Sequence, residues 1–332
     1  NMFISAKKDT NELDFLMEYC NIFLGESEDS LFSYDDFSKC QILDKAFIPR
    51  TTMDILDGIE QEYDFSNDEE VRFIAMDIAV VGGSNNDNTV LTAGCINKRT
   101  KKKRVEYIKA YNGMNSMLQV LESKRLFYEY QADFFIIDGK AMRNVMYDIF
   151  TDETYDEERS VTYPAWTVNM ENMLAMSSDA VLKEKATRTL RRDAKDVIVP
   201  FTGTSENNTT IHLAMRKAIR ESNIELLRDD GEMQVLMSEQ DPIWVTLSSE
   251  EKARRLIPFV ETRYTINESI SLTAKITDSG VKVDEARSNT KDRYMSLAMF
   301  NHFGDKLINK YTQEEDSGAP VNVDDWKFLQ SM

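Results

Sequence analysis

Histidine and cysteine are scarce in this chain of 332 residues, which contains two histidines and three cysteines. The cysteines, Cys20, Cys40 and Cys95, lie far apart and form no C-x-x-C pair. A disulfide framework or a Cys/His zinc site is therefore not expected. The scarcity of histidine also argues against Ser-His-Asp and Cys-His mechanisms. His212 falls inside a predicted helix and His302 near a predicted helix end, so both are expected to be packed or surface residues.

Long apolar runs are missing as well. No stretch of about 18 uncharged apolar residues occurs, and the N-terminal residues lack the basic-then-apolar pattern of a signal peptide. We therefore expect a cytoplasmic protein that is not secreted and has no contact with a membrane. The hydrophobic content of 42% is nevertheless sufficient for a substantial core in a chain of this length.

Positive charge is in deficit, because the formal net charge is -18. This balance argues against a protein that coats DNA through a generally basic surface, since phosphate binding depends on clustered Lys and Arg. It does not argue against local binding. Acids gathered at one centre can coexist with a small basic patch beside them, so the distribution of charge matters more than its sum.

Hydrophobic periodicity divides the chain near residue 70. Residues 9–24 have the apolar spacing of an amphipathic helix, and residues 1–66 as a whole are interpreted as an extension that docks onto a larger unit. Three consecutive strands are then predicted at residues 72–81, 89–97 and 104–112. The elements predicted after them are helix 116–131, strand 132–139, helix 141–152, strand 196–201, helix 208–223, strand 224–230, a β-hairpin within 269–286 and helix 291–309. The expected apolar face of helix 116–131 comprises Met117, Leu118, Leu121, Leu126 and Phe127. This order indicates an α/β protein with an antiparallel start rather than uniform βαβ winding.

Three aspartates stand at informative places in these elements. Asp77 interrupts the apolar run of the first strand, Asp138 ends the strand "FFIID", and Asp292 opens the last helix. A buried carboxylate is costly unless it is paired or bound to a metal, so convergence of the three acids would explain Asp77. Mg²⁺ and similar hard cations prefer such oxygen ligands, and two of them can activate water and stabilise the leaving oxygen of a phosphodiester. Taken singly, Asp138 could instead cap the next helix and Asp292 could be a first-turn acid favoured by the helix dipole.

The quoted motifs also resemble a known family. "FIAMDIAVVGGSNNDNT", "FFIIDG" and "KDRYMSLAMF" are similar, in order and spacing, to the nuclease domain of the large terminase subunits of tailed bacteriophages. The resemblance covers about residues 70–310. It implies an α/β, RNase H-like fold whose central mixed sheet, antiparallel in its first three strands, is flanked by helices and carries an added β-hairpin. The domains expected on this basis are an extension or linker at 1–66 resembling the end of the motor domain, the nuclease at 67–312 and a C-terminal tail at 313–332.

The resemblance implies a metal-dependent endonuclease that cuts double-stranded viral DNA during genome packaging in the cytoplasm of the infected bacterial host. Asp77, Asp138 and Asp292 would be its catalytic, metal-binding acids, with two Mg²⁺ or Mn²⁺ ions bridged by Asp77. Asp87 matches an acid of the loop after the first strand and either assists a metal or shapes the turn. The family often has two consecutive acids at the last motif, whereas this chain has Lys291 before Asp292, which leaves a fourth ligand from that helix in doubt.

The expected partners follow from the same resemblance. The chain has no G-x-x-x-x-G-K-[ST] phosphate loop, so it is interpreted as the nuclease part of a longer protein whose packaging ATPase domain, portal and small terminase subunit would be its partners. Two basic segments, 98–104 and 183–195, could hold DNA phosphates or could be solvated surface. The residues predicted to contact DNA are Lys101, Lys102, Lys103, Arg104, Arg188, Arg191 and Arg192.

Three other interpretations compete with this one. An RNase H-like resolvase or transposase would use similar acids. An actin-like ATPase would need a glycine two residues after the first strand's aspartate, where "DIA" stands. A non-catalytic module that binds the portal or DNA would leave the three aspartates without a common role, and metal binding that survives the loss of each aspartate would favour it.

Overall fold

The computed structural model describes residues 31–78, 88–139, 146–169, 193–277, 280–284 and 291–316. The helices are α3 (Tyr34–Ser38), α4 (Thr52–Leu56), α5 (Ser116–Glu129), α7 (Tyr147–Phe150), α10 (Ser205–Arg220), α11 (Asp230–Gln240), the 3₁₀ helix η2 (Trp244–Thr246), α12 (Ser249–Ile270) and α13 (Asp292–Asp316). The strands are β1 (Gln41–Leu43), β2 (Glu70–Asp77), β3 (Asn88–Asn97), β4 (Lys103–Asn112), β5 (Phe134–Asp138), β6 (Thr154–Asp156), β7 (Val161–Tyr163), β8 (Trp166–Val168), β9 (Lys195–Phe201), β10 (Ile224–Leu227), β11 (Thr273–Thr277) and β12 (Gly280–Asp284).

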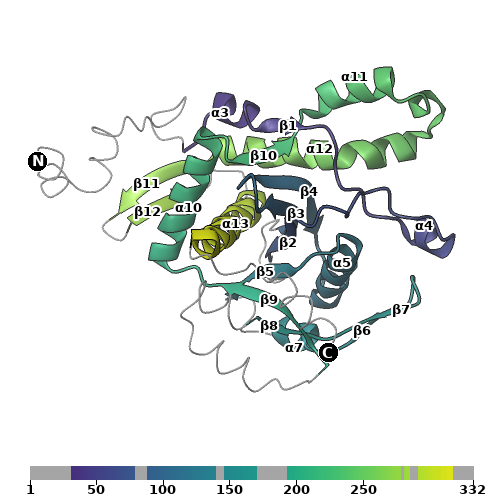
Figure 1. The fold of residues 1–332 in the computed structure, drawn as a ribbon, viewed down its shortest axis with the longest axis horizontal. Helices are drawn as coiled ribbons and strands as arrows, with labels where there is room; N and C mark the ends of the chain where they lie inside the picture. Colours follow the sequence, from purple (N-terminus) through teal and green to yellow (C-terminus); the bar gives the residue numbers. More distant parts are fainter. Residues whose placement is uncertain are drawn as a thin grey trace, which may run out of the picture.

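An eight-stranded mixed sheet forms the centre of the molecule, in the order β1-β10-β4-β3-β2-β5-β9-β8 (Figure 1). β2, β3 and β4 are successively antiparallel, whereas β5 is parallel to β2 and β9 is parallel to β5. The inner order β4-β3-β2-β5-β9, with three antiparallel strands followed by parallel ones, is that of the RNase H-like fold. The predicted fold class is therefore confirmed, and the added hairpin is the antiparallel pair β11–β12.

Side chains of β2 alternate between two cores, as expected for a strand buried on both faces. Phe73 and Ala75 belong to one core, which α10 and α13 cover, whereas Ile74 and Met76 belong to the other, which α5 covers. Figure 1 shows α13 and α10 on one side of the inner strands and α5 on the other. The odd-numbered residues of β2 therefore point towards α13, and Asp77 is the next of them.

Residues 31–66 take part in the same structure. β1 extends the central sheet by pairing in parallel with β10. Phe37 is fully buried in the core beneath α10 and α13, and Phe47 is fully buried in the core beneath α5. The domain boundary predicted at residue 66 stays a prediction, while the helix predicted at residues 9–24 lies outside the described residues.

Two expectations about individual elements are wrong. The strand predicted at residues 72–81 ends at Asp77, so this carboxylate stands at the end of a strand and not in its middle. In α5, Met117 and Leu118 are 59% and 45% exposed, and the helix instead buries Gln119, Ser123 and neighbouring residues. The Ser123 hydroxyl donates to the Gln119 carbonyl at 2.7 Å, which allows a polar side chain to lie inside.

Candidate active site

Two parallel strands bring Asp77 and Asp138 to one edge of the sheet. β2 pairs with β5 so that Met76 lies opposite Ile137, and each aspartate is the next residue of its strand. The strand pattern also places both on one face. Phe73 and Ala75 share a core with Phe134 and Ile136, so the aspartates two residues further on point to the face that α13 covers.

The first residue of α13, Asp292, reaches the same edge. The backbone N–H of Asn88, the first residue of β3, donates to Asp292 Oδ2 at 2.7 Å. β3 runs antiparallel to β2 with Val90 opposite Asp77, so Asn88 lies just beyond the end of β2. The structure therefore brings together the three aspartates that the sequence analysis singled out.

The negative charges of the acids affect one another. Burial raises the pKa of Asp77 well above its usual value, and the negative charges of Asp292 and then Asp138 raise it further. A backbone hydrogen bond from Ile78 opposes the shift, while the charge of Glu268 adds to it. All three aspartates are half-buried, their negative charges repel one another, and a bound cation would remove that repulsion.

Glu268 was not singled out by the sequence analysis. It lies near the end of α12, 24 residues before Asp292, and no spacing or strand end distinguishes it from the other acids of that helix. The sequence holds no signal for it, because its place depends on how α12 packs against α13.

The type of ligand in this cluster fits a hard divalent cation. Carboxylate oxygens are the groups that Mg²⁺ and Mn²⁺ bind, and half-buried acids that repel one another are what such an ion would neutralise. As they stand, the described residues contain no group of three or more His, Cys, Asp or Glu side chains arranged to hold a metal ion. The chemistry of the cluster is thus suitable, but the carboxylates are not drawn together into a ready coordination group.

Hydrogen bonds fix the start of α13 against the sheet. The Ser296 hydroxyl donates to the backbone oxygen of Ala75 at 3.0 Å and shares a 2.8 Å hydrogen bond with the Thr92 hydroxyl. The Tyr294 hydroxyl lies 2.8 Å from His212 Nδ1 inside the core. Asp292 is therefore carried by a turn that is held to β2, β3 and α10, and His212 is a packed residue as predicted.

The first residues of β4 require a correction to the predicted DNA contacts. Lys103 is 1% exposed and forms an ion pair with Asp305, and Arg104 forms ion pairs with Glu70 at 2.6 Å and Glu106 at 3.1 Å. The charge of Lys103 is used inside the protein, so the prediction that Lys103 binds phosphate is wrong. The side chain of Arg104 is 28% exposed, and its contact with DNA stays a prediction.

Lys101 and Lys102 belong to the turn between β3 and β4, which lies at the far end of the sheet from Asp77. Asn97, at the end of β3, pairs with Glu70 at the start of β2. Glu70 and Asp77 are seven residue steps apart along β2, roughly 23 Å at the usual strand rise. Lys102 Nζ donates to the Ser222 carbonyl at 2.5 Å. The other predicted site residues, Asp87, Arg188, Arg191 and Arg192, lie outside the described residues.

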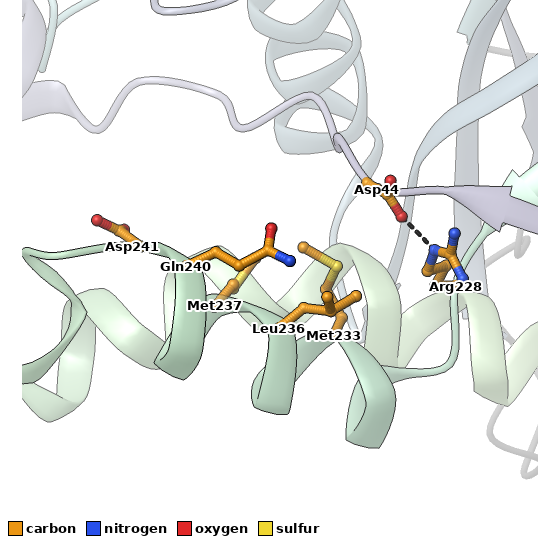
Figure 2. A pocket seen from close by; sticks show the side chains of 7 residues that line it. All are labelled: Asp44, Arg228, Met233, Leu236, Met237, Gln240 and Asp241. Atoms are coloured by element: carbon orange, nitrogen blue, oxygen red, sulfur yellow. Dashed lines mark hydrogen bonds and ion pairs between the residues drawn. The ribbon is translucent and has the colours of Figure 1, made fainter.

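A pocket of about 480 Å³ lies elsewhere, between α11 and the chain that follows β1 (Figure 2). Met233, Leu236 and Met237 form an apolar wall, and the ion pair of Asp44 with Arg228 closes one end. The pocket contains none of the clustered carboxylates. We therefore place the candidate active site at the acids and not at this pocket.

Comparison with known proteins gives matches among solved structures alone. No family model and no curated protein matches the chain. The large terminase nuclease from thermophilic phage G20c is similar, with 12% sequence identity and a TM-score of 0.45 over 82% of this chain and 98% of that chain. The large terminase nuclease domain of Thermus phage P74-26 has 12% identity and a TM-score of 0.39 over 80% and 92% of the two chains. The nuclease domain of the large terminase subunit gp2 of bacterial virus Sf6 has 9% identity and a TM-score of 0.38 over 82% and 98%. All three are nuclease domains of large terminase subunits, the family that the sequence motifs resemble.

Proposed function

We propose that this chain is a divalent-metal-dependent nuclease that cuts double-stranded DNA, with Asp77, Asp138 and Asp292 as its catalytic acids. One observation carries the proposal. The parallel pairing of β2 with β5 and the hydrogen bond from Asn88 to Asp292 gather three carboxylates at one edge of an RNase H-like sheet.

Different parts of the chain hold each of the three acids in place. Asp77 and Asp138 are held by neighbouring strands, and Asp292 is held by the Asn88 N–H and by the turn that Ser296 ties to β2. In the proposal, Asp77, Asp138 and Asp292 are the residues that would hold the Mg²⁺ or Mn²⁺ ions. Such ions activate water and stabilise the leaving oxygen of a phosphodiester. The residues themselves supply negative charge and fixed positions.

We further propose that this nuclease acts in genome packaging of a tailed bacteriophage. It is supported by the order of the three motifs along the chain, "FIAMDIAVVGGSNNDNT", "FFIIDG" and "KDRYMSLAMF". In this proposal the partners are the packaging ATPase domain, the portal and the small terminase subunit, and the enzyme acts in the host cytoplasm. Within the described residues, no helix is both long and apolar enough to cross a membrane.

Conversion of supercoiled plasmid to nicked and linear forms tests the activity. Wild type, Asp77→Ala and Asp57→Ala should be compared in Mg²⁺, Mn²⁺ and EDTA, where Asp57 is an exposed acid at the end of α4 that serves as the control. We expect cutting that needs the metal, is lost in Asp77→Ala and persists in Asp57→Ala. Cutting that persists in Asp77→Ala would contradict the proposed site. A wild type that cuts with neither metal would favour a non-catalytic module that binds the portal or DNA.

A further inference from the structure

Glu268 stands beside the proposed active site. Its side chain, 7% exposed, comes from the last turns of α12, and its Oε1 accepts a hydrogen bond from the backbone N–H of Tyr294 at 2.9 Å. Its negative charge also adds to the charges of Asp292 and Asp138 that raise the pKa of Asp77. Glu268 therefore links the backbone of α13 with the cluster of acids.

The hydrogen bond from Tyr294 belongs to the first turn of α13. The first N–H groups of an α-helix have no partner within the helix and need an acceptor from elsewhere. Tyr294 is the third residue of α13, and Asp292 is the first. A carboxylate that accepts from this turn is also favoured by the positive end of the helix dipole. Glu268 thereby holds the turn that carries Asp292.

A second glutamate of α12 provides an internal comparison. Glu261 Oε2 accepts hydrogen bonds from Nε and Nη2 of Arg293, both at 3.1 Å, and Arg293 Nη1 lies 3.8 Å from Glu268 Oε2. Both glutamates thus interact with the same arginine of α13, and both side chains are largely buried. Glu268 in addition accepts from the backbone of α13 and adds to the charge around Asp77.

This inference rests on the proposed function. We propose that Glu268 is a positioning residue, which fixes the first turn of α13 so that Asp292 stays beside Asp77. Glu268 also strengthens divalent-cation binding, because it adds a fourth negative charge. Glu268 acts through Asp292 and through its own electrostatic field, without contact with the substrate. Residues that orient metal ligands in this way commonly change metal affinity by about 10–100-fold when they are replaced.

Calorimetric titration of the full chain with Mn²⁺ separates the two contributions. Glu268→Gln keeps an oxygen that can accept from Tyr294 but removes the charge, whereas Glu268→Ala removes both. We expect Mn²⁺ affinity to fall about threefold to tenfold in Glu268→Gln and more than about tenfold in Glu268→Ala. Glu261→Gln, which weakens the same arginine pair, should stay within about twofold of wild type. Affinity in both Glu268 variants equal to that of Glu261→Gln would overturn the proposal.

Hydrogen exchange of the metal-free chain tests the positioning separately from metal binding. The amides in the first turn of α13 should exchange faster in Glu268→Ala than in wild type, Glu268→Gln or Glu261→Gln. Unchanged exchange in Glu268→Ala would overturn the positioning role, whatever the Mn²⁺ titration shows. If wild type binds no Mn²⁺ while Glu268→Ala still exchanges faster, the proposed metal-dependent function fails and the positioning of Asp292 by Glu268 stands.

Discussion

Asp77 combines burial with the negative charges of Asp292, Asp138 and Glu268. Without a cation, this arrangement should make the folded protein less stable than it would be with a neutral side chain of the same shape. Asp77→Asn should therefore stabilise the metal-free chain by about 1–2 kcal/mol and raise its Tm by roughly 2–6 °C. Thermal unfolding in EDTA measures this, and a lower Tm for the variant would contradict the account.

The gain in stability from Asp77→Asn should depend on pH. Because the pKa of Asp77 is higher in the folded protein than in the unfolded chain, the folded state holds a proton that the unfolded state has already released. The wild type therefore loses stability as the pH rises above about 4 and through the raised pKa. The difference in free energy of unfolding between Asp77→Asn and wild type should widen over this interval, as urea unfolding at a series of pH values would show.

The two histidines produce the opposite dependence on pH. Burial, together with Lys291 for His212 and Lys306 for His302, lowers the pKa of each to about 4. Between pH 6.5 and about 4 the unfolded chain binds protons that the folded protein does not, so acidification should destabilise the fold.

For His212 this loss should reach about 3 kcal/mol at most. His212→Asn keeps a hydrogen-bonding partner for the Tyr294 hydroxyl but does not titrate, so its stability should fall less between pH 6.5 and 4 than that of wild type. Identical pH profiles from urea unfolding would contradict the assignment of a buried, neutral His212.

At the scale of helices and strands, the packing of α13 on the sheet depends on its close approach to β3. A methyl group at Gly94 would overlap the carbonyl oxygen of Arg104 and lie 2.7 Å from Phe300 Cζ in α13. Gly94→Ala should therefore destabilise the fold by about 2 kcal/mol or more. Gly203→Ala is the control, because its nearest neighbour would be the Asn208 side chain at 3.1 Å. Equal Tm values for the two variants would contradict the packing described.

The sequence predicted the inner strands well and the outer elements poorly. β2, β3 and β4 have apolar runs bounded by polar turns, which is a local signal. β1 has only three residues, and its place in the sheet comes from parallel pairing with β10, far away along the chain. The long helix α12 was missed because Pro258 and many charged residues interrupt its apolar pattern.

The candidate site was predictable only in part, for a similar reason. Asp77, Asp138 and Asp292 stand at the ends or starts of elements with strong local signals, so their convergence could be inferred. Glu268 depends on how α12 packs against α13, and the burial of Lys103 depends on its partner Asp305, 202 residues later. Contacts of this kind leave no spacing in the sequence.

Across the protein as a whole, the negative net charge restricts where DNA can bind. The turn with Lys101 and Lys102 lies at the far end of β2, so Lys101→Glu with Lys102→Glu should leave plasmid cutting within about twofold of wild type.

Arg191→Glu with Arg192→Glu should instead weaken DNA binding and reduce its dependence on salt by about one ion for each phosphate that the variant no longer binds. Fluorescence anisotropy at several salt concentrations, in Ca²⁺ in place of Mg²⁺, measures the binding. The reverse pattern would place the DNA at the far end of the sheet.

We propose that Asp77, Asp138 and Asp292 form one metal site. Calorimetric titration of Mn²⁺ into wild type, Asp77→Asn, Asp138→Asn and Asp292→Asn tests it most directly, with folding checked by circular dichroism. We predict that wild type binds Mn²⁺ and that each substitution weakens binding by at least about tenfold, because each removes a carboxylate from the same cluster. Wild-type affinity in any one of the three variants would contradict the claim that the acids act together.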